Sequence, residues 1–206
     1  MATIGQTAGM VGHDMRNPLQ TIVGILYLMM DDLNNLPESC EKKDFQELLN
    51  SVDESVIYIN KIVADLQDYT RLIQLIFQEV DLQNLIENTL NLIVIPHNVK
   101  IFVNMDEGFS VRFDSDLMKR VFTTLITNAV QALPEGGSLT VNADKNENGI
   151  TISFSDTGLG IPEDIKPKIF TPLFTTKSKG QGFGLAVCKR IVEAHNGEIT
   201  FESEAG

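Results

Sequence analysis

The chain has 206 residues, a length that fits one large domain or two small ones. Its 43% hydrophobic and 21% charged residues are ordinary for a globular protein and exclude intrinsic disorder and fibrous repeats. Lys and Arg number 16 against 28 Asp and Glu, and the net charge of −12 argues against nucleic acid as the main partner, because nucleic-acid binding needs an electropositive surface.

The first predicted element is a long helix that carries a heptad repeat. Its apolar residues alternate in spacings of four and three, as in the a/d seam of a coiled coil: Met15, Leu19, Ile22, Leu26, Met29 and Leu33. Pro37 interrupts the pattern, and the same rhythm returns in a second helix over residues 45–66. A companion stripe on the second helix exceeds what one partner helix can cover: Leu48, Ile62, Tyr69 and Ile76. Two such hairpins packed as a four-helix bundle would cover both stripes, so we expect a homodimer.

After Asp81 the heptad gives way to shorter, mixed elements, so the sequence predicts a second domain of the α+β class. The predicted boundary separates residues 1–78 from residues 79–206. In the second domain we expect a short helix from Pro162, helices over residues 82–92, 116–133 and 183–196, and strands over residues 99–103, 138–143, 150–155 and 198–203. The second and third of these strands flank a polar turn and should form a hairpin.

Cysteine usage and hydropathy indicate a soluble chain in a reducing compartment. Cys40 and Cys188 lie too far apart in sequence for a disulfide framework or for metal-ligand spacing, so we expect free thiols. The longest apolar stretch, residues 22–30, is much shorter than the roughly 20 residues of a membrane span, and no signal peptide opens the chain. We therefore expect a cytoplasmic segment with no membrane contact.

Residues 165–192 form a basic stretch in an acidic chain. The stretch has no carboxylate and holds Lys166, Lys168, Lys177, Lys179, Lys189 and Arg190. Gly180, Gly182 and Gly184 stand just before a predicted helix, where bare backbone N–H groups and the positive helix end can bind an anion together. Phosphate is the natural candidate, although a flexible surface loop explains this stretch equally well by itself. The glycine spacing matches neither the P-loop nor the dinucleotide-binding pattern.

Two further polar positions in the second domain suit a nucleotide. Asp156, Gly158 and Gly160 follow a predicted strand, and such a turn can aim a carboxylate at an exocyclic amine while the glycines let a planar base approach. Asn128 lies at the edge of an apolar helix face, where its amide oxygen can ligate Mg²⁺ between the protein and phosphates. Each pattern is weak alone, and an asparagine that caps or bridges to a neighbouring loop is the alternative.

The first helix carries a candidate nucleophile. His13 occupies heptad position b, which faces away from the seam, and Asp14 beside it can polarise one ring nitrogen while the other attacks a phosphoryl group. Pro18 kinks the helix one turn later. The alternative is a solvated surface histidine in a kinked helix. His97 and His195 have no ligand-like neighbours and are interpreted as structural.

Together these segments resemble the catalytic core of a sensor histidine kinase of a two-component system, over essentially the whole chain. Residues 13–19 resemble the H-box, residues 124–131 the N-box, residues 156–160 the G1 box, residues 169–177 the F-box and residues 180–185 the G2 box. The resemblance implies a two-helix hairpin for dimerisation and histidine phosphotransfer. It further implies that an α/β two-layer sandwich follows, the ATP-binding domain of the Bergerat type.

The resemblance also implies roles for residues of the hairpin. His13 would be the phosphoacceptor, Asp14 the general base on its other ring nitrogen, and Asn17 the residue that positions water in a phosphatase reaction. The phosphoryl group would pass from the histidine to an aspartate of a response-regulator receiver domain.

In the second domain the resemblance implies ATP and Mg²⁺ as cofactors. Asn128 would hold Mg²⁺, Asp156 would bind the adenine amino group, and the loop over residues 171–182 would be the ATP lid. Lys177 and Lys179 would neutralise the β and γ phosphates. The remaining nucleotide contacts would come from Gly158, Gly160, Thr175, Thr176, Gly182, Gly184 and Leu185.

Three departures from the family pattern leave alternatives open. Thr124 stands where the N-box often has a first asparagine, and Gln131 replaces a basic residue that many relatives use on the phosphates. The chain also stops after the predicted strand over residues 198–203, one strand short of the usual end, so we expect a trimmed domain with an uncovered sheet edge. A catalytically inert dimeric scaffold is one alternative. A Bergerat-fold ATPase is disfavoured, because its water-activating glutamate would stand at Thr124.

Overall fold

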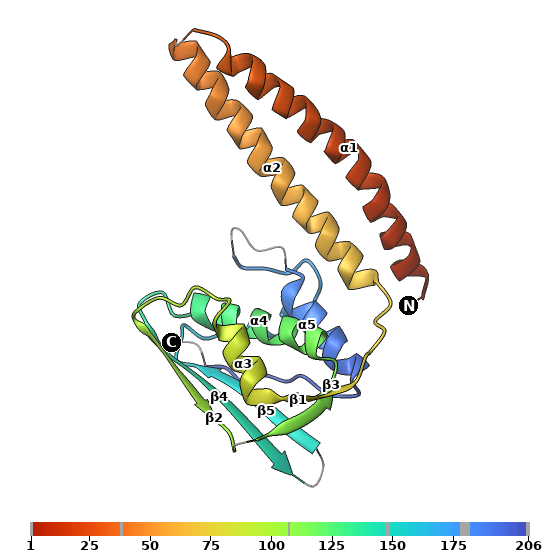
Figure 1. The fold of residues 1–206 in the computed structure, drawn as a ribbon, viewed down its shortest axis with the longest axis vertical. Coiled ribbons are helices and arrows are strands. Elements are labelled where there is room, and N and C mark those ends of the chain that lie inside the picture. Colours follow the sequence, from red (N-terminus) through yellow and green to blue (C-terminus); the bar gives the residue numbers. More distant parts are fainter. Residues whose placement is uncertain (1, 38, 107, 147–148, 178–181, 205–206) are drawn as a thin grey trace. The chain divides into compact units, whose positions relative to one another are not determined.

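The chain separates into two compact units, Met1–Leu72 and Ile73–Gly206, and each is described by itself. The computed structural model describes residues 2–37, 39–106, 108–146, 149–177 and 182–204 (Figure 1). Within these ranges it describes the backbone alone for residues 2–14, 16, 40, 68 and 146. None of the helices in the described ranges is both long and apolar enough to cross a membrane.

The first unit is a helical hairpin, as the heptad pattern predicts. Helix α1 spans Ala2–Asn34 and helix α2 spans Cys40–Thr70. The Ser39 side chain caps α2 by accepting a hydrogen bond from Lys42 N at 3.1 Å. The Lys42 ammonium donates to the Leu36 carbonyl oxygen at 2.8 Å, which satisfies a backbone group just beyond the end of α1. The short connection therefore folds the two helices back on each other.

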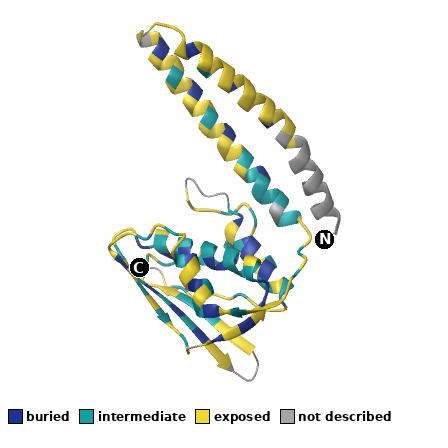
Figure 2. Cartoon of the chain, in the orientation of Figure 1, coloured by how far each residue is buried: buried dark blue, intermediate teal, exposed yellow. Residues whose placement is uncertain are grey.

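Only half of each predicted heptad seam is buried inside the hairpin. The core consists of residues spaced seven apart on both helices, each 9% exposed or less: Leu19, Leu26, Leu33, Leu49, Val56 and Val63. In the other half Leu66 is partly buried, and the remaining six residues are between 37% and 57% exposed: Met15, Ile22, Met29, Phe45, Val52 and Ile59. Figure 2 shows this pattern as isolated buried positions on helices that are otherwise largely exposed. One hairpin thus leaves a continuous apolar stripe uncovered.

The second unit is a two-layer α/β sandwich, as predicted. One sheet has the order β2-β4-β5, with β2 (Val99–Asn104) parallel to β4 (Gly137–Asn146) and β4 antiparallel to β5 (Gly149–Asp156). A second sheet pairs β1 (Gln78–Asp81) with β3 (Ser110–Phe113) in antiparallel fashion. The other layer contains the helices α3 (Leu82–Leu90), α4 (Ser115–Gln131) and α5 (Gly184–Ala194), as Figure 1 shows.

Helix α4 is the centre of the core in this unit. Its buried residues are Val121, Phe122, Ile126 and Ala129. The Phe122 ring contacts the rings of Phe113 and Phe154, at centroid distances of 6.4 and 5.5 Å. These contacts fix α4 against both sheets, so residues on its flanks keep a defined position relative to the loops at the sheet ends.

Asp114 joins the N-terminus of α4 to the segment that enters the domain. Its Oδ1 accepts from Leu117 N at 3.1 Å, and its Oδ2 accepts from Ile76 N at 2.8 Å. Burial raises the pKa of Asp114, but hydrogen bonds from backbone N–H groups and the neighbouring His195 together outweigh it, so the net pKa is lowered. The Asp114 backbone N–H donates to His195 Nε2 at 3.1 Å, while Nδ1 of that ring lies 2.8 Å from the Ile191 carbonyl oxygen. His195 is therefore structural, with its proton on Nδ1.

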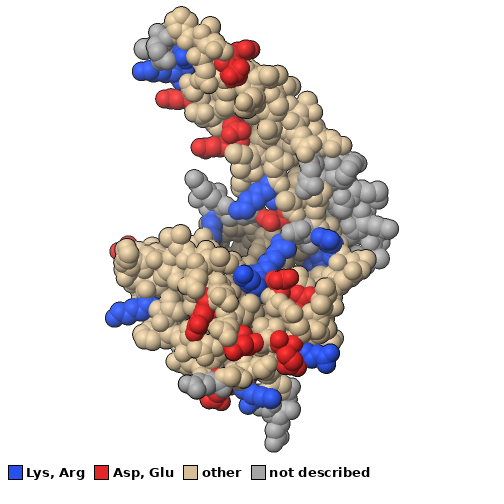
Figure 3. All heavy atoms as spheres, viewed as in Figure 1, with Lys and Arg blue, Asp and Glu red and all other residues tan. Residues whose placement is uncertain are grey.

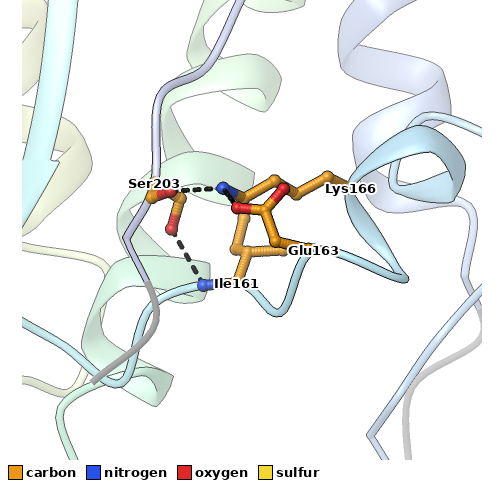
Figure 4. A network of polar contacts seen from close by, with 4 residues as sticks. All are labelled: Ile161, Glu163, Lys166 and Ser203. Carbon is orange, nitrogen blue, oxygen red and sulfur yellow. Dashed lines mark hydrogen bonds and ion pairs between the residues drawn. The ribbon is translucent and has the colours of Figure 1, made fainter.

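The segment over residues 198–203 is not the strand that the sequence predicts. It has no ladder partner among the described residues. Ser203 bonds instead to the loop over residues 161–168, in which a 3-10 helix over Lys166–Lys168 stands where a helix from Pro162 was expected. Ile161 N donates to Ser203 Oγ at 2.8 Å, and the Lys166 ammonium donates to the Ser203 carbonyl oxygen and to Glu163 (Figure 4). The Phe201 ring also packs edge-on against Phe170. The segment thus follows this loop rather than a sheet edge. The alternation of polar and apolar residues in this segment fits both a strand at a sheet edge and an extended segment that bonds to a loop, so the sequence cannot distinguish them.

Candidate functional site

The centre of the candidate site is the C-terminal half of α4. Phe122, Ile126 and Ala129 face the core, which places Asn128 on the flank of the helix, partly exposed. Asn128 Oδ1 accepts a hydrogen bond from Lys177 Nζ at 2.7 Å. In this structure Asn128 thus bridges to a neighbouring loop, which is the arrangement that the sequence indicates as the alternative to a metal ligand.

Lys177 reaches α4 from the end of the segment that resembles the F-box, of which it is the last residue. Its backbone N–H donates to Thr175 Oγ1 at 3.1 Å, which turns the chain just before the lysine. Its ammonium donates to Gln131 Oε1 at 2.5 Å in addition to Asn128. Burial of the ammonium lowers the pKa of Lys177. Thr176 is exposed beside it, and Lys179 lies outside the described residues.

Asp156 ends strand β5 and begins a tight loop that is joined to α4. Its Oδ1 accepts from Gly158 N at 2.9 Å, and Leu159 N donates to the Ala132 carbonyl oxygen at 3.1 Å. A Cβ on Gly158 would lie 2.5 Å from that carbonyl oxygen, so only glycine allows this approach. Gly160 follows with a φ of +68°, a left-handed conformation. Asp156 is exposed, and one turn of α4 separates its loop from Asn128.

Gly182 brings the two ends of the predicted lid together. Its φ is +72°, and a Cβ there would lie 2.5 to 2.6 Å from backbone atoms of Leu173 and Phe174. Leu173 is itself left-handed, with a φ of +67°, which is a strained conformation for a leucine. The backbones on either side of residues 175–181 are therefore in direct contact.

Thr124 serves the packing of α4 on α5. Its hydroxyl donates to the Arg120 carbonyl oxygen at 3.0 Å, and its methyl group would lie 3.1 Å from a Cβ on Gly184. Glycine at the start of α5 thus allows the two helices to approach closely. A threonine whose hydroxyl bonds to its own helix does not act as a water-activating base. Leu185, the next residue of α5, is partly buried.

The charges of the basic stretch are partly compensated. Lys166 pairs with Glu163, and Lys189 lies 3.8 Å from a Glu193 carboxylate oxygen and over the Phe170 ring. Both carboxylates lie just outside residues 165–192, three and four residues from the lysines with which they pair. On the face of the second unit that Figure 3 shows, acidic and basic side chains lie interspersed. Lys177 differs, because amide oxygens hold its ammonium.

The remaining predicted residues lie on α1. His13 and Asp14 are in the helix, but their side chains lie outside the described part. Asn17 is exposed, and its carbonyl oxygen accepts from Thr21 Oγ1 at 3.2 Å. Helix α1 continues through Pro18.

The residues near Asn128 fit a metal ion that is held mainly by its substrate. Oxygen is the ligand that Mg²⁺ prefers, and this ion usually takes one or two protein oxygens together with phosphates and water. In the described ranges no three His, Cys, Asp or Glu side chains group closely enough to hold a metal by themselves. The amide oxygen of Asn128 is of the type that such an ion accepts.

The contact of Gln131 with Lys177 was not predicted from the sequence. Gln131 was noted in the sequence only because many relatives have a basic residue at this position. The signal that could have found it is its spacing, because three residues after Asn128 it lies on the same face of the helix.

Two family models match the chain. The model described as "His Kinase A (phospho-acceptor) domain" matches residues 3–75. The model described as "Histidine kinase-, DNA gyrase B-, and HSP90-like ATPase" matches residues 113–206. The candidate site described above lies within the second of these ranges, and His13 lies within the first.

Curated relatives match along the whole chain. The signal transduction histidine-protein kinase AtoS of Escherichia coli (strain K12) is 32% identical over 211 residues, which cover 100% of this chain and 34% of AtoS. The sensor histidine kinase ZraS of the same strain is 32% identical over 210 residues, covering 100% of this chain and 44% of ZraS. The chain thus spans less than half the length of these relatives.

Solved structures show the same architecture. The catalytic domain of histidine kinase ThkA matches with a TM-score of 0.52 and 31% identity, over 58% of this chain and 81% of that domain. Histidine kinase ThkA in complex with response regulator protein TrrA matches with a TM-score of 0.61 and 25% identity, over 94% of this chain and 56% of the other.

Proposed function

The chain belongs to the sensor histidine kinases of two-component systems, and from that premise we propose that it transfers the γ-phosphoryl group of ATP to its own His13. The observation that carries this proposal is the convergence on α4. Lys177 bonds to Asn128, and the Asp156 loop bonds to Ala132 at the end of the same helix. Helix α4 thus bonds to the cationic group, Lys177, and to the loop of Asp156, the carboxylate proposed for adenine. It also carries Asn128, the proposed metal ligand.

In the proposed reaction a ring nitrogen of His13 is the nucleophile. The N–P bond forms as the bond between the γ-phosphorus and the bridging oxygen breaks, and ADP leaves with the electron pair of that bond. Asp14 accepts a hydrogen bond from the other ring nitrogen, which keeps the attacking nitrogen unprotonated and stabilises the positive charge on the ring. The product is a phosphoramidate.

The residues around α4 would bind and orient ATP. The Asp156 carboxylate retains acceptor capacity beyond its bond to Gly158 and would accept from the adenine amino group. Lys177 would neutralise the phosphates, and Asn128 would hold Mg²⁺. When bound, this ion supplies charge neutralisation for the transferring group. Lys179, Thr175, Thr176 and the glycine-rich start of α5 remain predicted contacts of the phosphates.

The proposed assembly is a homodimer through the hairpin. The uncovered half of the two heptad seams supports it, because a single hairpin leaves these apolar side chains 37% to 57% exposed. A second hairpin would bury them in a four-helix bundle. We propose residues 1–78 for the hairpin and 79–206 for the ATP-binding domain, whereas the compact units of the structure divide six residues earlier, after Leu72.

The proposed acceptor of the phosphoryl group is an aspartate of a response-regulator receiver domain. The match to ThkA in complex with response regulator TrrA supports a partner of this kind. Asn17 is exposed on α1 and would position water for a phosphatase reaction, in which the phosphoryl group of the receiver aspartate is transferred to water. We place these reactions in the cytoplasm, and the buried free thiol of Cys188 agrees with a reducing compartment.

Labelling with γ-³²P ATP and Mg²⁺ tests the proposal. We expect label that is lost in acid, as a phosphoramidate is, and that is absent from a His13→Ala chain. His97→Ala is the matched control and should be labelled like the unmodified chain. Acid-stable label, or equal labelling of the His13→Ala chain, would disprove the assignment of His13. ATP binding without any label would favour the inert scaffold.

A further inference from the structure

The Lys177 ammonium is held by two amide oxygens that belong to one face of α4. Asn128 Oδ1 and Gln131 Oε1 accept from it at 2.7 and 2.5 Å. Residues three apart on a helix are neighbours, so the two acceptors form a pair into which one ammonium fits. Lys177 comes from a segment 46 residues further along the chain than Gln131, so the contact fixes the loop to the helix.

Both acceptors are neutral, which distinguishes Lys177 from other lysines of the basic stretch. Lys166 and Lys189 form ion pairs with the carboxylates of Glu163 and Glu193, which compensate their charge. Amide oxygens orient an ammonium without cancelling its charge. The charge of Lys177 is therefore held in place and remains available to an anion.

The two acceptors are not equivalent once a cation binds at Asn128. An amide oxygen that ligates a metal ion is a poor acceptor for an ammonium, because the two positive charges repel each other. Gln131 is then the acceptor that still holds Lys177.

We propose that Gln131 is a positioning residue, which keeps the Lys177 ammonium directed at the phosphates of the nucleotide beside Asn128. This inference rests on the proposed function. This role explains why a glutamine can stand at position 131, where many relatives have a basic residue. A basic side chain there would repel Lys177, and a carboxylate would neutralise it, whereas a glutamine lets the cationic group come from the loop instead of the helix.

A double-mutant cycle on the full chain tests this role through binding alone. The variants are Gln131→Met, which keeps the length of the side chain but removes the acceptor, Lys177→Met, and both together. Affinities for ATP and for adenosine are measured by calorimetry, in EDTA and again with Mg²⁺. Gln83→Met is the matched control, because the Gln83 amide bonds to Glu87 on α3 and not to Lys177.

We expect Gln131→Met to weaken ATP binding about threefold to tenfold and to leave adenosine binding unchanged. Added to Lys177→Met, it should have no further effect, because its role acts through the lysine. Gln83→Met should bind both ligands as the unmodified chain does.

Three results would overturn the inference. An equal loss of ATP affinity with and without Lys177 would mean that Gln131 does not act through the lysine. A parallel loss of adenosine affinity would indicate a structural role. Unchanged ATP binding by Gln131→Met would remove the role while the proposed function stands, whereas an unmodified chain that binds no ATP would disprove the proposed function itself.

Discussion

Replacement of Asp114 should separate two functions of one carboxylate. The side chain caps α4 through Leu117 N and also anchors the entering segment through Ile76 N. Asp114→Ala removes both bonds. Asp114→Asn keeps an oxygen for Leu117 but turns an NH₂ group toward the Ile76 N–H, so only the anchor is lost.

The structure sets the size of each effect. Loss of an N-cap costs about 1 kcal/mol, and loss of one further hydrogen bond to a charged, buried acceptor costs about as much again. Asp114 is only 7% exposed, so these values need little reduction for solvent screening. We expect the free energy of unfolding of the second unit to fall by about 2 kcal/mol in Asp114→Ala and by about 1 kcal/mol in Asp114→Asn.

The same carboxylate predicts a dependence on pH. Its pKa in the folded chain lies below the ordinary value of 3.8, so its contribution is fully present above that value and is lost as the pH falls through the lower, folded pKa. The Asp114→Asn chain lacks a group that titrates here. The difference in stability between the two chains should therefore shrink as the pH is lowered below 3.8.

Native-state hydrogen exchange measures these effects within the second unit alone. Protection of the α4 amides gives the stability, and protection of the Ile76 amide reports the anchor. Asp116→Asn, at an exposed aspartate in the first turn of α4, is the matched control and should cost less than about 0.5 kcal/mol. Equal losses in Asp114→Asn and Asp114→Ala, or a protected Ile76 amide in Asp114→Asn, would refute the reasoning.

Three further predictions concern single residues. Gly24→Ala should raise the stability of the hairpin by about 1 kcal/mol, because Gly24 lies inside α1 with nothing within 4 Å of an added Cβ, and a higher melting temperature by circular dichroism would check it. Gly182→Ala should destabilise the second unit by more than about 1 kcal/mol in urea unfolding, because the new Cβ would lie 2.5 Å from a backbone atom and the φ is +72°. An unchanged midpoint of urea unfolding would contradict this prediction. In a Cys40→Ser chain, Cys188 should react with a thiol reagent at pH 8 only after unfolding, because burial raises the pKa of Cys188 to about 11. Rapid labelling of the folded chain would contradict this prediction.

The sequence predicted those elements whose signal is local and periodic. The heptad spacing of the first helices and the alternation around the turn near residue 147 identified the hairpin of helices and the β4–β5 pair. The strands β1 and β3 were missed because each has only four residues and pairs with the other across about 30 residues of chain, so neither carries a periodic signal of its own. Residues 198–203 alternate like a strand, but their partners lie in a loop.

For the candidate site, the sequence predicted the types of group but not all of their contacts. The residues Asn128 and Lys177 were identified by motif, and the structure brings them together. The participation of Gln131 depends on where the loop meets α4, which is a long-range contact. By contrast, Glu163 and Glu193 lie only three and four residues from Lys166 and Lys189, so their spacing could have predicted both pairs.

The division of each heptad seam into a buried and an uncovered half has a consequence for how the hairpin responds to dilution. Substitutions in the buried half, such as Leu26→Ala, remove contacts within one chain, so their cost should be the same at any protein concentration. Substitutions in the uncovered half, such as Ile22→Ala, should act only on association, so their effect on the melting temperature should depend on concentration. Folding of the helices and choice of a partner chain can therefore vary independently, although both are encoded within the same seven-residue repeat.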